Sequence, residues 1–373
     1  MNFKSYPLGN LVNIRYGKNQ KKVASEKGTF PIYGTGGLMG YATEPLYDKP
    51  SVLIGRKGTI DKVRYVTHPF WTVDTLFYTE IDDTKVLPHY LYYYLSLLDL
   101  KKYNEGTTIP SLRTETLNRI EISVPEIEEQ QCVLALLEPI DSKIETNKQI
   151  NDNLEQQLTA LFIHDFADGI AAASTDTCPM LGDLITVIDN RGKTPPLTTE
   201  IFDYPIIDVG ALKGSGRIVD FNNCTKYVEQ ATYETWFRSG HPKSWDILIS
   251  TVGSLAEMKV YLGAKGCMAQ NVVALRATSI SPLYLYQYLR FIRADLVAYN
   301  IGSVQPSIKV THIVKHPIFV PEFSKLQEFE ATAMAITNHL YANYNECESL
   351  KELRDTLLPK LMSGELDVSD LNL

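Results

Sequence analysis

The sequence is built from two copies of one pattern. Matching segments follow one another in the same order along both halves: 6–12 with 179–185, 30–32 with 204–206, 52–59 with 247–254, 88–95 with 282–289, 106–112 with 302–308 and 124–126 with 320–322. The offset is 173 residues at the start and 196 from Pro110 onward, so the second copy holds about twenty extra residues between Ile206 and Ile247. A duplication in a chain of 373 residues predicts two similar globular cores rather than one large one.

Each copy begins with a globular part, which spans residues 1–125 and 167–321. Both parts are rich in Gly, Pro, Tyr and Thr and contain short β-branched runs, which are typical of short strands bounded by turns. One helix is predicted in each copy, at 88–103 and 282–299, because a proline stands in its first turn, where the missing N–H is not needed. The predicted fold class is therefore α+β, with two repeated mixed α/β domains.

A long helix is predicted after each globular part, over residues 126–166 and 322–373. Apolar residues in both segments step by three and four, which is the seam of a coiled coil. Asn147 and Asn343 occupy equivalent positions of this seam, and a buried asparagine pair fixes coiled-coil register. We therefore expect the two helices to pack on each other. The alternative is two separate amphipathic helices, each lying on its own domain. Pro139 is expected to kink or restart the first helix.

Motifs for catalysis are largely missing. The phosphate-loop, dinucleotide-binding, serine-hydrolase and zinc-protease patterns are all incomplete. Asp246 with Glu257 and Lys259 resembles the acid–acid–lysine pattern of a nuclease, which keeps metal-dependent cleavage open as a lesser alternative. The histidines are scattered and no CxxC pair occurs, so we expect no metal site and no cofactor.

The remaining composition indicates a cytoplasmic protein. The five cysteines are odd in number and scattered, as expected of reduced thiols. The sequence has no run of about 18 apolar residues, and its first residues lack the apolar stretch of a secretory signal. We therefore expect no membrane partner.

The formal net charge of −8 at first argues against a nucleic-acid partner, because DNA binding needs a positive surface. The charge is unevenly distributed, however: residues 1–125, 126–166, 167–321 and 322–373 carry +4, −7, +1 and −6. The acid lies almost entirely on the helices, whereas basic residues of the globular parts stand beside glycine turns. Such turns suit a close approach to phosphates and base edges. Ordinary solvated turns remain the alternative explanation.

Several sequence motifs follow one another in a fixed order along the chain. They are Leu8-Gly-Asn-Leu with its copy 181–184, and Asn190-Arg-Gly-Lys-Thr-Pro-Pro. They also include Gly106-Thr-Thr-Ile-Pro-Ser-Leu with its copy at Gly302, and Val124-Pro-Glu-Ile-Glu-Glu-Gln-Gln with its copy at Val320. With the helix ends at 161–162 and 357–364, the order of these motifs resembles that of the specificity (S) subunits of Type I restriction–modification systems. The resemblance covers essentially the whole chain.

The resemblance implies two target recognition domains, 1–125 and 167–321, each of which reads one half of a bipartite, asymmetric target in double-stranded DNA. It implies that the spacer helices, 126–166 and 322–373, pack antiparallel with pseudo-two-fold symmetry and bind two methyltransferase (M) subunits. Methylation and ATP-driven cleavage would then belong to partner M and restriction (R) subunits, and this chain would be non-catalytic. A coiled-coil scaffold that binds only protein is the alternative function.

Candidate DNA contacts are the polar and glycine residues of the basic turns. In the first copy they are Lys18, Lys21, Lys22, Thr35, Gly36, Gly37, Arg56, Lys57, Arg64, Thr107 and Thr108. In the second copy they are Arg191, Lys193, Thr194, Lys213, Arg217, Ser250, Thr251, Ser254, Ser303 and Gln305. The residues that precede the shared Pro-Ser either contact DNA or cap a helix: Thr107, Thr108, Ser303 and Gln305.

Overall fold

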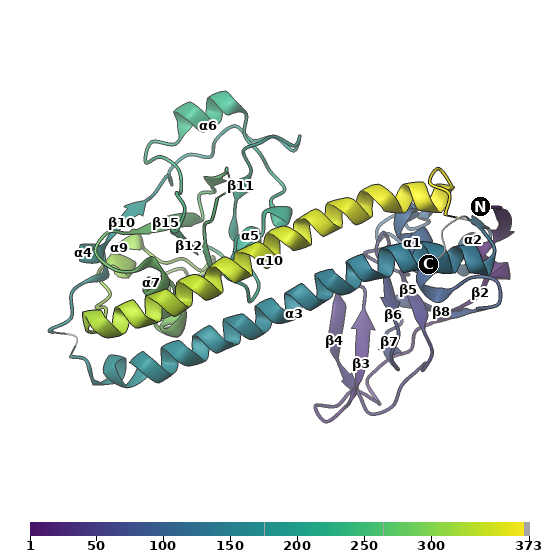
Figure 1. The fold of residues 1–373 in the computed structure, drawn as a ribbon, viewed down its shortest axis with the longest axis horizontal. Coiled ribbons are helices and arrows are strands. Elements are labelled where there is room, and N and C mark those ends of the chain that lie inside the picture. Colours follow the sequence, from purple (N-terminus) through teal and green to yellow (C-terminus); the bar gives the residue numbers. More distant parts are fainter. Residues whose placement is uncertain (175, 264, 369–373) are drawn as a thin grey trace. The chain divides into compact units, whose positions relative to one another are not determined.

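The computed structural model describes residues 1–174, 176–263 and 265–368. The chain divides into two compact units: unit 1 is Met1–Ile144 with Glu348–Leu373, and unit 2 is Glu145–Cys347. Each unit thus combines one globular copy with a segment of both long helices (Figure 1). The helices are shared between the units and are not separate parts of the chain.

The globular part of unit 1 is built on an antiparallel four-stranded sheet of order β2-β8-β5-β6. A smaller sheet of order β4-β3-β7 contains one parallel pair, β3 with β7, and β1 pairs with β9. The strands are β1 (Lys4–Pro7), β2 (Val12–Tyr16), β3 (Phe30–Gly34), β4 (Gly37–Ala42), β5 (Ser51–Gly55), β6 (Val63–Val66), β7 (Trp71–Thr72), β8 (Leu76–Ile81) and β9 (Glu121–Val124). The short helices are η1 (Leu8–Asn10), α1 (Pro88–Leu97), η2 (Leu100–Tyr103) and α2 (Thr114–Asn118).

Unit 2 has a four-stranded antiparallel sheet of order β10-β15-β12-β13 and a parallel pair, β11 with β14. Helical turns α5, η3 and α6 occupy the twenty-residue insertion and its surroundings. The strands are β10 (Ile185–Ile188), β11 (Ile206–Ile207), β12 (Ile247–Ser250), β13 (Met258–Val260), β14 (Cys267–Met268) and β15 (Val272–Ala277). The short helices are α4 (Leu181–Leu184), α5 (Val209–Leu212), η3 (Phe221–Asn223), α6 (Gln230–Trp236), α7 (Pro282–Phe291), α8 (Arg293–Ala298) and α9 (Val310–Val314).

The two four-stranded sheets share strand order and register. Leu53 lies opposite Arg64 in unit 1, and the corresponding Leu248 lies opposite Lys259 in unit 2. The parallel pairs also correspond, since β3 with β7 and β11 with β14 occupy matching places in the two copies. The matched sequence segments therefore form matched structure within each unit.

Both predicted globular helices are shorter than expected. In unit 1 the helix ends at Leu97 because Leu98 is extended, and Asp99 then caps a separate turn, η2. In unit 2 the helix is interrupted at Ile292, whose ψ of 15° leaves the helical region, and α8 follows. One continuous helix over 88–103 or 282–299 was thus wrong.

The long helices are α3 (Ile127–Ala172) and α10 (Phe323–Ser363). α3 runs through Pro139 without interruption, so the expected restart there is wrong. Pro139 is exposed, and water can bond the carbonyl that its missing N–H leaves free. α10 ends before Gly364, whose φ of +77° is the left-handed conformation that a glycine adopts after a helix C-terminus.

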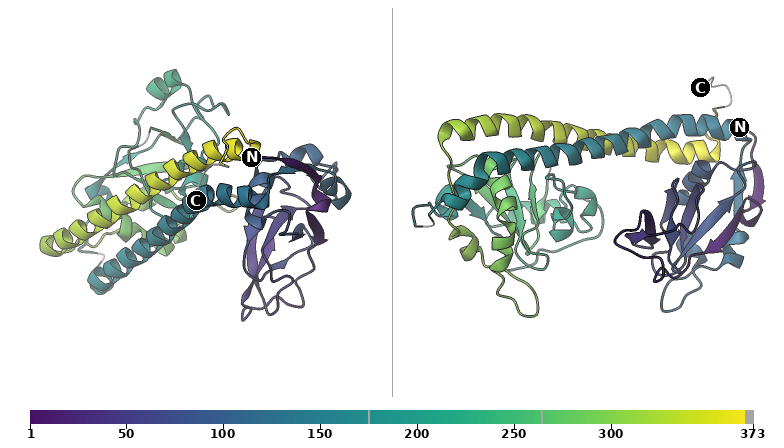
Figure 2. Two further views of the ribbon diagram at one scale, coloured as in Figure 1. Left: turned by 45° about the vertical axis from the view of Figure 1, so that its right-hand side comes forward. Right: turned by 90° about the horizontal axis from the view of Figure 1, so that it is seen from below.

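The apolar faces of both helices are part of the two cores. In unit 1, Val133 and Leu137 of α3 and Leu361 of α10 are buried against α1 and the sheet. In unit 2, Phe162 of α3 and Phe329 of α10 pack edge to face, with their ring centroids 5.8 Å apart. The unit 2 segments of the two helices lie side by side (Figure 2). The helix faces therefore hold each globular part in place.

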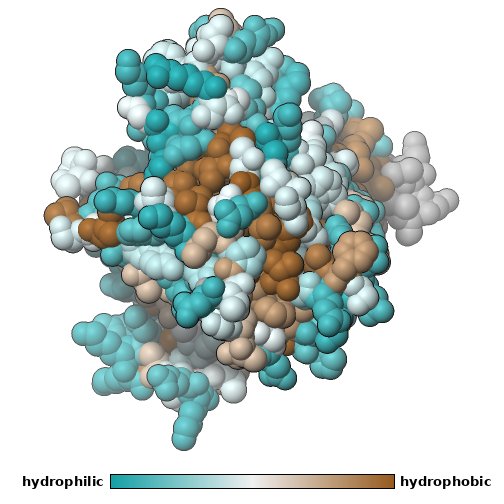
Figure 3. Space-filling view, turned by 90° about the vertical axis from the view of Figure 1, so that its left-hand side faces the viewer, coloured by the Kyte–Doolittle hydropathy of each residue, from teal (hydrophilic) through white to brown (hydrophobic). Residues whose placement is uncertain are grey.

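Some hydrophobic side chains of unit 2 stay at the surface. Figure 3, in which the side with α4 and α9 faces the viewer, shows them among hydrophilic ones. Near the end of α3 and the start of α10 the exposed hydrophobic residues include Ile163, Val320 and Phe323. None of the described helices is both long and apolar enough to cross a bilayer.

Candidate nucleic-acid interface

One short backbone segment, residues 72–75, joins three of the basic loops of unit 1. The Thr72 carbonyl accepts the Lys18 amide at 2.8 Å, and the Val73 amide donates to the Tyr33 carbonyl at 3.0 Å. The Asp74 carbonyl accepts the Arg56 guanidinium at 2.8 Å. The Thr75 carbonyl accepts the amides of Arg56 at 2.9 Å and Lys57 at 3.2 Å. Candidates that lie far apart in sequence are thereby brought to one end of the β2–β8 ladder.

Two glycines make this close approach of backbones possible. A Cβ atom on Gly17 would lie 2.0 Å from the carbonyl oxygen of Val73, and one on Gly55 would lie 2.1 Å from that of Thr59. Any side chain at either place would push the loops apart. The glycines beside Lys18 and Arg56 are therefore required by packing as well as by turn geometry.

The loop 104–111 is braced against the same turn. The Asn104 side-chain oxygen accepts the amides of Gly106 and Ser111, both at 2.9 Å. The carbonyl of Pro110 accepts the Gly58 amide at 2.9 Å. The brace leaves the candidates at the tip exposed: Thr107 and Thr108. They do not cap the following helix, because the residue before α2 is Arg113 and makes no side-chain cap bond.

The hairpin of β3 and β4 brings a further group of candidates together. The Arg64 guanidinium lies over the Tyr33 ring, 5.3 Å from its centroid. A Cβ on Gly37 would be 3.3 Å from the same guanidinium, and Gly37 has a φ of +118°. Thr35 and Gly36 form the hairpin turn. Two more candidates are exposed in the turn that follows Lys18: Lys21 and Lys22.

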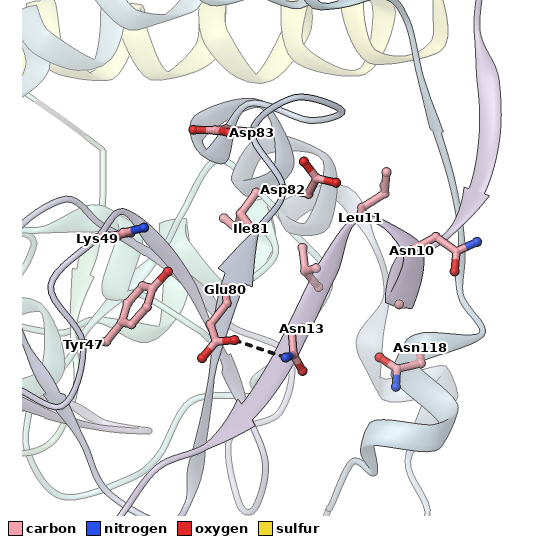
Figure 4. A pocket seen from close by; sticks show the side chains of 12 residues that line it. Asn10, Leu11, Asn13, Tyr47, Lys49, Glu80, Ile81, Asp82, Asp83 and Asn118 are labelled. Carbon is pink, nitrogen blue, oxygen red and sulfur yellow. Dashed lines mark hydrogen bonds between the residues drawn. The ribbon is translucent and has the colours of Figure 1, made fainter.

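The opposite end of the β2–β8 ladder is acidic. An open hollow there is lined by Glu80, Asp82 and Asp83, and Asn13 donates to Glu80 at 3.1 Å (Figure 4). Lys85 forms an ion pair with Asp82 at 2.8 Å and holds the pKa of that carboxyl below its usual value. Carboxylates repel phosphate, so only the basic end of the ladder suits DNA.

Unit 2 builds a matching arrangement around residues 269–271. The amide of Ala269 donates to the Ile207 carbonyl at 3.0 Å, and the Asn271 carbonyl accepts the Thr251 amide at 2.8 Å. Gln270 donates to the Thr194 hydroxyl at 2.8 Å. Segment 269–271 thus occupies the place that segment 72–75 occupies in unit 1, and Thr194 lies beside it.

The loop 300–307 repeats the brace of loop 104–111. Asn300 accepts the amides of Gly302 at 3.0 Å and Ser307 at 2.9 Å. The Pro306 carbonyl accepts the Gly253 amide at 2.9 Å. The tip again exposes its candidates, Ser303 and Gln305.

Two candidates on the neighbouring turn are not available to DNA. Ser250 and Thr251 are fully buried, and the Ser250 hydroxyl donates to the Ser254 carbonyl at 2.6 Å. The side chain of Ser250 closes the turn instead of pointing outward, so assigning these two residues to DNA contact was wrong. Ser254 itself is exposed.

Arg217 was also assigned wrongly to DNA. Its side chain is buried and donates to both carboxylate oxygens of Glu155 on α3, each at 2.9 Å. It also donates to Thr337 of α10 at 2.9 Å, and its guanidinium lies 5.2 Å from the Tyr286 ring centroid. Arg217 therefore fastens the glycine turn to both helices within unit 2. Lys213, at the start of this turn, is exposed.

The loop after β10 carries a tightly held arginine. Arg191 donates from Nε and Nη2 to the two carboxylate oxygens of Asp189, at 2.9 and 2.6 Å. Burial raises the pKa of Asp189, but the hydrogen bonds and charge of Arg191 outweigh it, and the pKa is lowered overall. An open hollow beside the pair is also lined by Lys193, Trp236 and Arg238. The hollow carries more positive than negative charge.

The residues of the nuclease alternative do not form a catalytic group. Asp246 is paired with Arg276 at 2.7 Å, and Glu257 is paired with Arg293 at 2.8 Å. Lys259 is buried and donates to the carbonyls of the 213–217 turn. Burial lowers the pKa of Lys259 to about 8. The described part of the chain also contains no cluster of three His, Cys, Asp or Glu residues able to hold a metal.

The two seam asparagines are buried in unit 2 but do not bond to each other. Asn343 donates to Asn151 at 2.9 Å, and Asn147 donates to Glu346 at 2.7 Å. From Asn147 to Asn151 the residue numbers rise along α3, whereas their bonded partners fall from Glu346 to Asn343 along α10. Equivalent positions of the two helices therefore do not face each other. Asn147 and Asn343 each face a different polar residue of the opposite helix.

Comparison with known proteins relates this chain to one family. Residues 1–156 match the family described as Type I restriction modification DNA specificity domain. The chain is 26% identical over 349 residues to the Type I restriction enzyme MjaIX specificity subunit of Methanocaldococcus jannaschii, covering 87% of this chain and 80% of that protein. The chain is similar to Type I specificity subunits over most of its length. The HindI specificity subunit of Haemophilus influenzae is 23% identical over 363 residues, covering 75% of this chain and 78% of that protein.

The fold agrees with that similarity. The crystal structure of a Type I restriction–modification S subunit from M. genitalium has a TM-score of 0.61 and 18% identity, and the match covers 97% of this chain and 96% of that one. The curated relatives named above are specificity subunits of Type I restriction enzymes, and the solved neighbour is an S subunit of such a system.

Proposed function

We propose that this chain is the sequence-reading subunit of a Type I restriction–modification complex, and that each unit reads one half of a bipartite, asymmetric DNA target. The observation that carries the proposal is the repeated loop surface. Segments 72–75 and 269–271 each gather a turn, a basic loop and an asparagine-braced loop at one end of a sheet. The framework is common to both units, whereas the exposed residues on it differ.

The difference between the two surfaces supports an asymmetric target. Arg56 and Lys57 of unit 1 correspond to Thr251 and Val252 of unit 2. The exposed basic residues of unit 2 lie instead in the loop after β10, where Lys193 is exposed, and in and around α6. Different donors on one framework favour different base sequences.

The helices have a second part in this proposal. As an antiparallel coiled coil with pseudo-two-fold symmetry, α3 and α10 set the spacing between half-sites and dock two methyltransferase subunits, and restriction subunits join the full complex. The opposed partners Asn343 with Asn151 and Asn147 with Glu346 support the antiparallel direction. Exposed Ile163 and Phe323 on the helices support docking, because apolar surface favours a protein partner.

Binding to duplex DNA by the chain together with its methyltransferase partner tests the proposal. We expect specific binding that weakens steeply with salt, because phosphate contacts release counterions. The weak basicity of the units, +4 and +1 over their globular parts, predicts that the isolated chain binds less tightly than the complex. Assembly with the partner and no change in its affinity for DNA would favour the scaffold function instead.

A further inference from the structure

In each unit, one arginine side chain contacts the residue at the same position of the shared sheet framework. Tyr16, the last residue of β2, corresponds at the 173-residue offset to Asp189, which directly follows β10. The Arg56 guanidinium lies over the Tyr16 ring, 5.0 Å from its centroid. Asp189 accepts two hydrogen bonds from Arg191. The two arginines come from different loops, yet the equivalent position orients both.

The contacts with Tyr16 and Asp189 leave hydrogen-bond donors free at the end of each guanidinium. Asp189 takes Nε and Nη2 of Arg191, and among the described residues no partner takes Nη1. Arg56 donates from Nη1 to the Asp74 carbonyl at 2.8 Å and stacks on Tyr16, which leaves its Nη2 group available. A guanidinium has five N–H donors in a fixed planar fork, so the free edge has a defined direction in each case.

We infer that Arg56 and Arg191 each read a guanine, one in each half-site, and that Tyr16 and Asp189 are the positioning residues that hold them. Two parallel donors of a guanidinium match O6 and N7 of guanine in the major groove, the commonest specific contact of arginine. The inference rests on the proposed function and names the base that each unit recognises.

Charge and rigidity favour a base over a phosphate as the partner. The Asp189 carboxylate offsets the charge of Arg191, which weakens its attraction to phosphate but leaves its remaining N–H groups able to donate. Both arginines are partly buried and held at two points, so little side-chain freedom is lost on binding. The neighbouring lysines Lys18, Lys57 and Lys193 are exposed and suit phosphates as mobile point charges.

The experiment uses the full chain in complex with its methyltransferase partner. Base preference is measured by competition with duplexes in which each base pair of the target is replaced in turn, and salt dependence is measured on the same complexes. In the variants Arg56→Lys and Arg191→Lys the charge is kept but the fork is lost. We expect each to lower discrimination at a single G·C pair by about 10-fold or more, in different half-sites, with an unchanged salt slope.

The positioning residues provide the matched controls. Tyr16→Leu removes the ring and should relax the same G·C pair as Arg56→Lys, whereas Tyr16→Phe keeps the ring and should restore discrimination. Asp189→Ala should relax the same pair as Arg191→Lys. Unchanged base preference in both lysine variants would overturn the inference and leave the proposed function standing. A wild-type complex with no sequence-specific target would overturn the proposed function itself.

Discussion

Replacing Arg217 by methionine should lower the free energy of unfolding of unit 2 by about 3 kcal/mol. Glu155 is only 5% exposed, and the substitution removes the two guanidinium bonds that it accepts at 2.9 Å. Leaving one partner of a buried ion pair without the other costs about 3–5 kcal/mol. The lower end applies because Arg290 remains 3.3 Å from Glu155 and the backbone amide of residue 217 still donates to it at 2.8 Å.

Hydrogen exchange measures this loss separately for each unit. A loss of about 3 kcal/mol should speed exchange of the protected β12 and β13 amides by about 100-fold, because each 1.4 kcal/mol is a factor of ten. The amides of β5 and β8 in unit 1 serve as the internal control. The double variant Arg217→Met with Glu155→Leu should recover most of the loss, since an apolar pair of similar volume replaces a buried ion pair at little cost.

Two results would refute this reasoning. The first is an exchange rate in β12 and β13 that changes less than about threefold in Arg217→Met, because a change that small is under 1 kcal/mol. The second is a loss of DNA affinity in that variant with exchange unaltered, which would return Arg217 to the DNA-contacting role that its neighbouring glycines suggested.

The double variant Arg56→Ala, Lys57→Ala should weaken DNA binding and reduce the slope of log affinity against log salt by about 1, because Lys57 suits a phosphate whereas Arg56 suits a base. An unaltered slope would reject Lys57 as a phosphate contact. Burial lowers the pKa of Lys259 to about 8, below its usual value of 10.5, so the unfolded chain binds more protons between these values and stability rises with pH. Urea denaturation should show a gain on the order of 1 kcal/mol from pH 7 to pH 9 that is absent in Lys259→Met. Inserting one heptad after both Ile144 and Cys347 should lengthen the gap between half-sites by about 3 bp, because seven helical residues rise about 10.5 Å, and methylome sequencing showing an unchanged gap would contradict it.

The contacts of α3 within unit 2 decide where a heptad can be inserted. A heptad placed after Asn151 alone would shift the remainder of α3 against α10 within unit 2. Asn151 accepts from Asn343, and Glu155 four residues further on holds Arg217. The division of the chain falls instead after Ile144 and before Glu348, so lengthening both helices there keeps the contacts of each unit.

The duplication and the sheets could be predicted from sequence because they depend on local patterns. Short β-branched runs between glycine turns become paired strands in both units, and matching segments take matching registers. The long helices could be predicted for the same reason, since their three-and-four spacing is continuous. Their ends were less predictable, and α3 continues six residues beyond position 166 to Ala172.

The candidate site was only partly predictable because burial depends on distant partners. Arg217 beside a glycine turn looks exposed until Glu155, 62 residues away, is placed against it. Segments 72–75 and 269–271 act through backbone carbonyls, which leave no mark in a sequence. The braces of Asn104 and Asn300 did leave a signal, because an asparagine stands two residues before the same glycine in both copies and favours this turn.

Tyr16 and Asp189 escape sequence reasoning for a different reason. They share a framework position but have unlike side chains, and a match of residue types does not connect a phenol ring with a carboxylate. Only the placement of a guanidinium beside each one relates them. Equivalent positions in a duplicated fold can thus each hold an arginine guanidinium with a different kind of side chain.

Methylome sequencing of cells with and without this chain, in the presence of its methyltransferase partner, is the direct test of whether the two units read two different half-sites. We expect one modified target of two different specified halves separated by unspecified bases, present with the chain and absent without it. A target that is continuous, or two identical halves, or a modification pattern that does not depend on the chain, would contradict it.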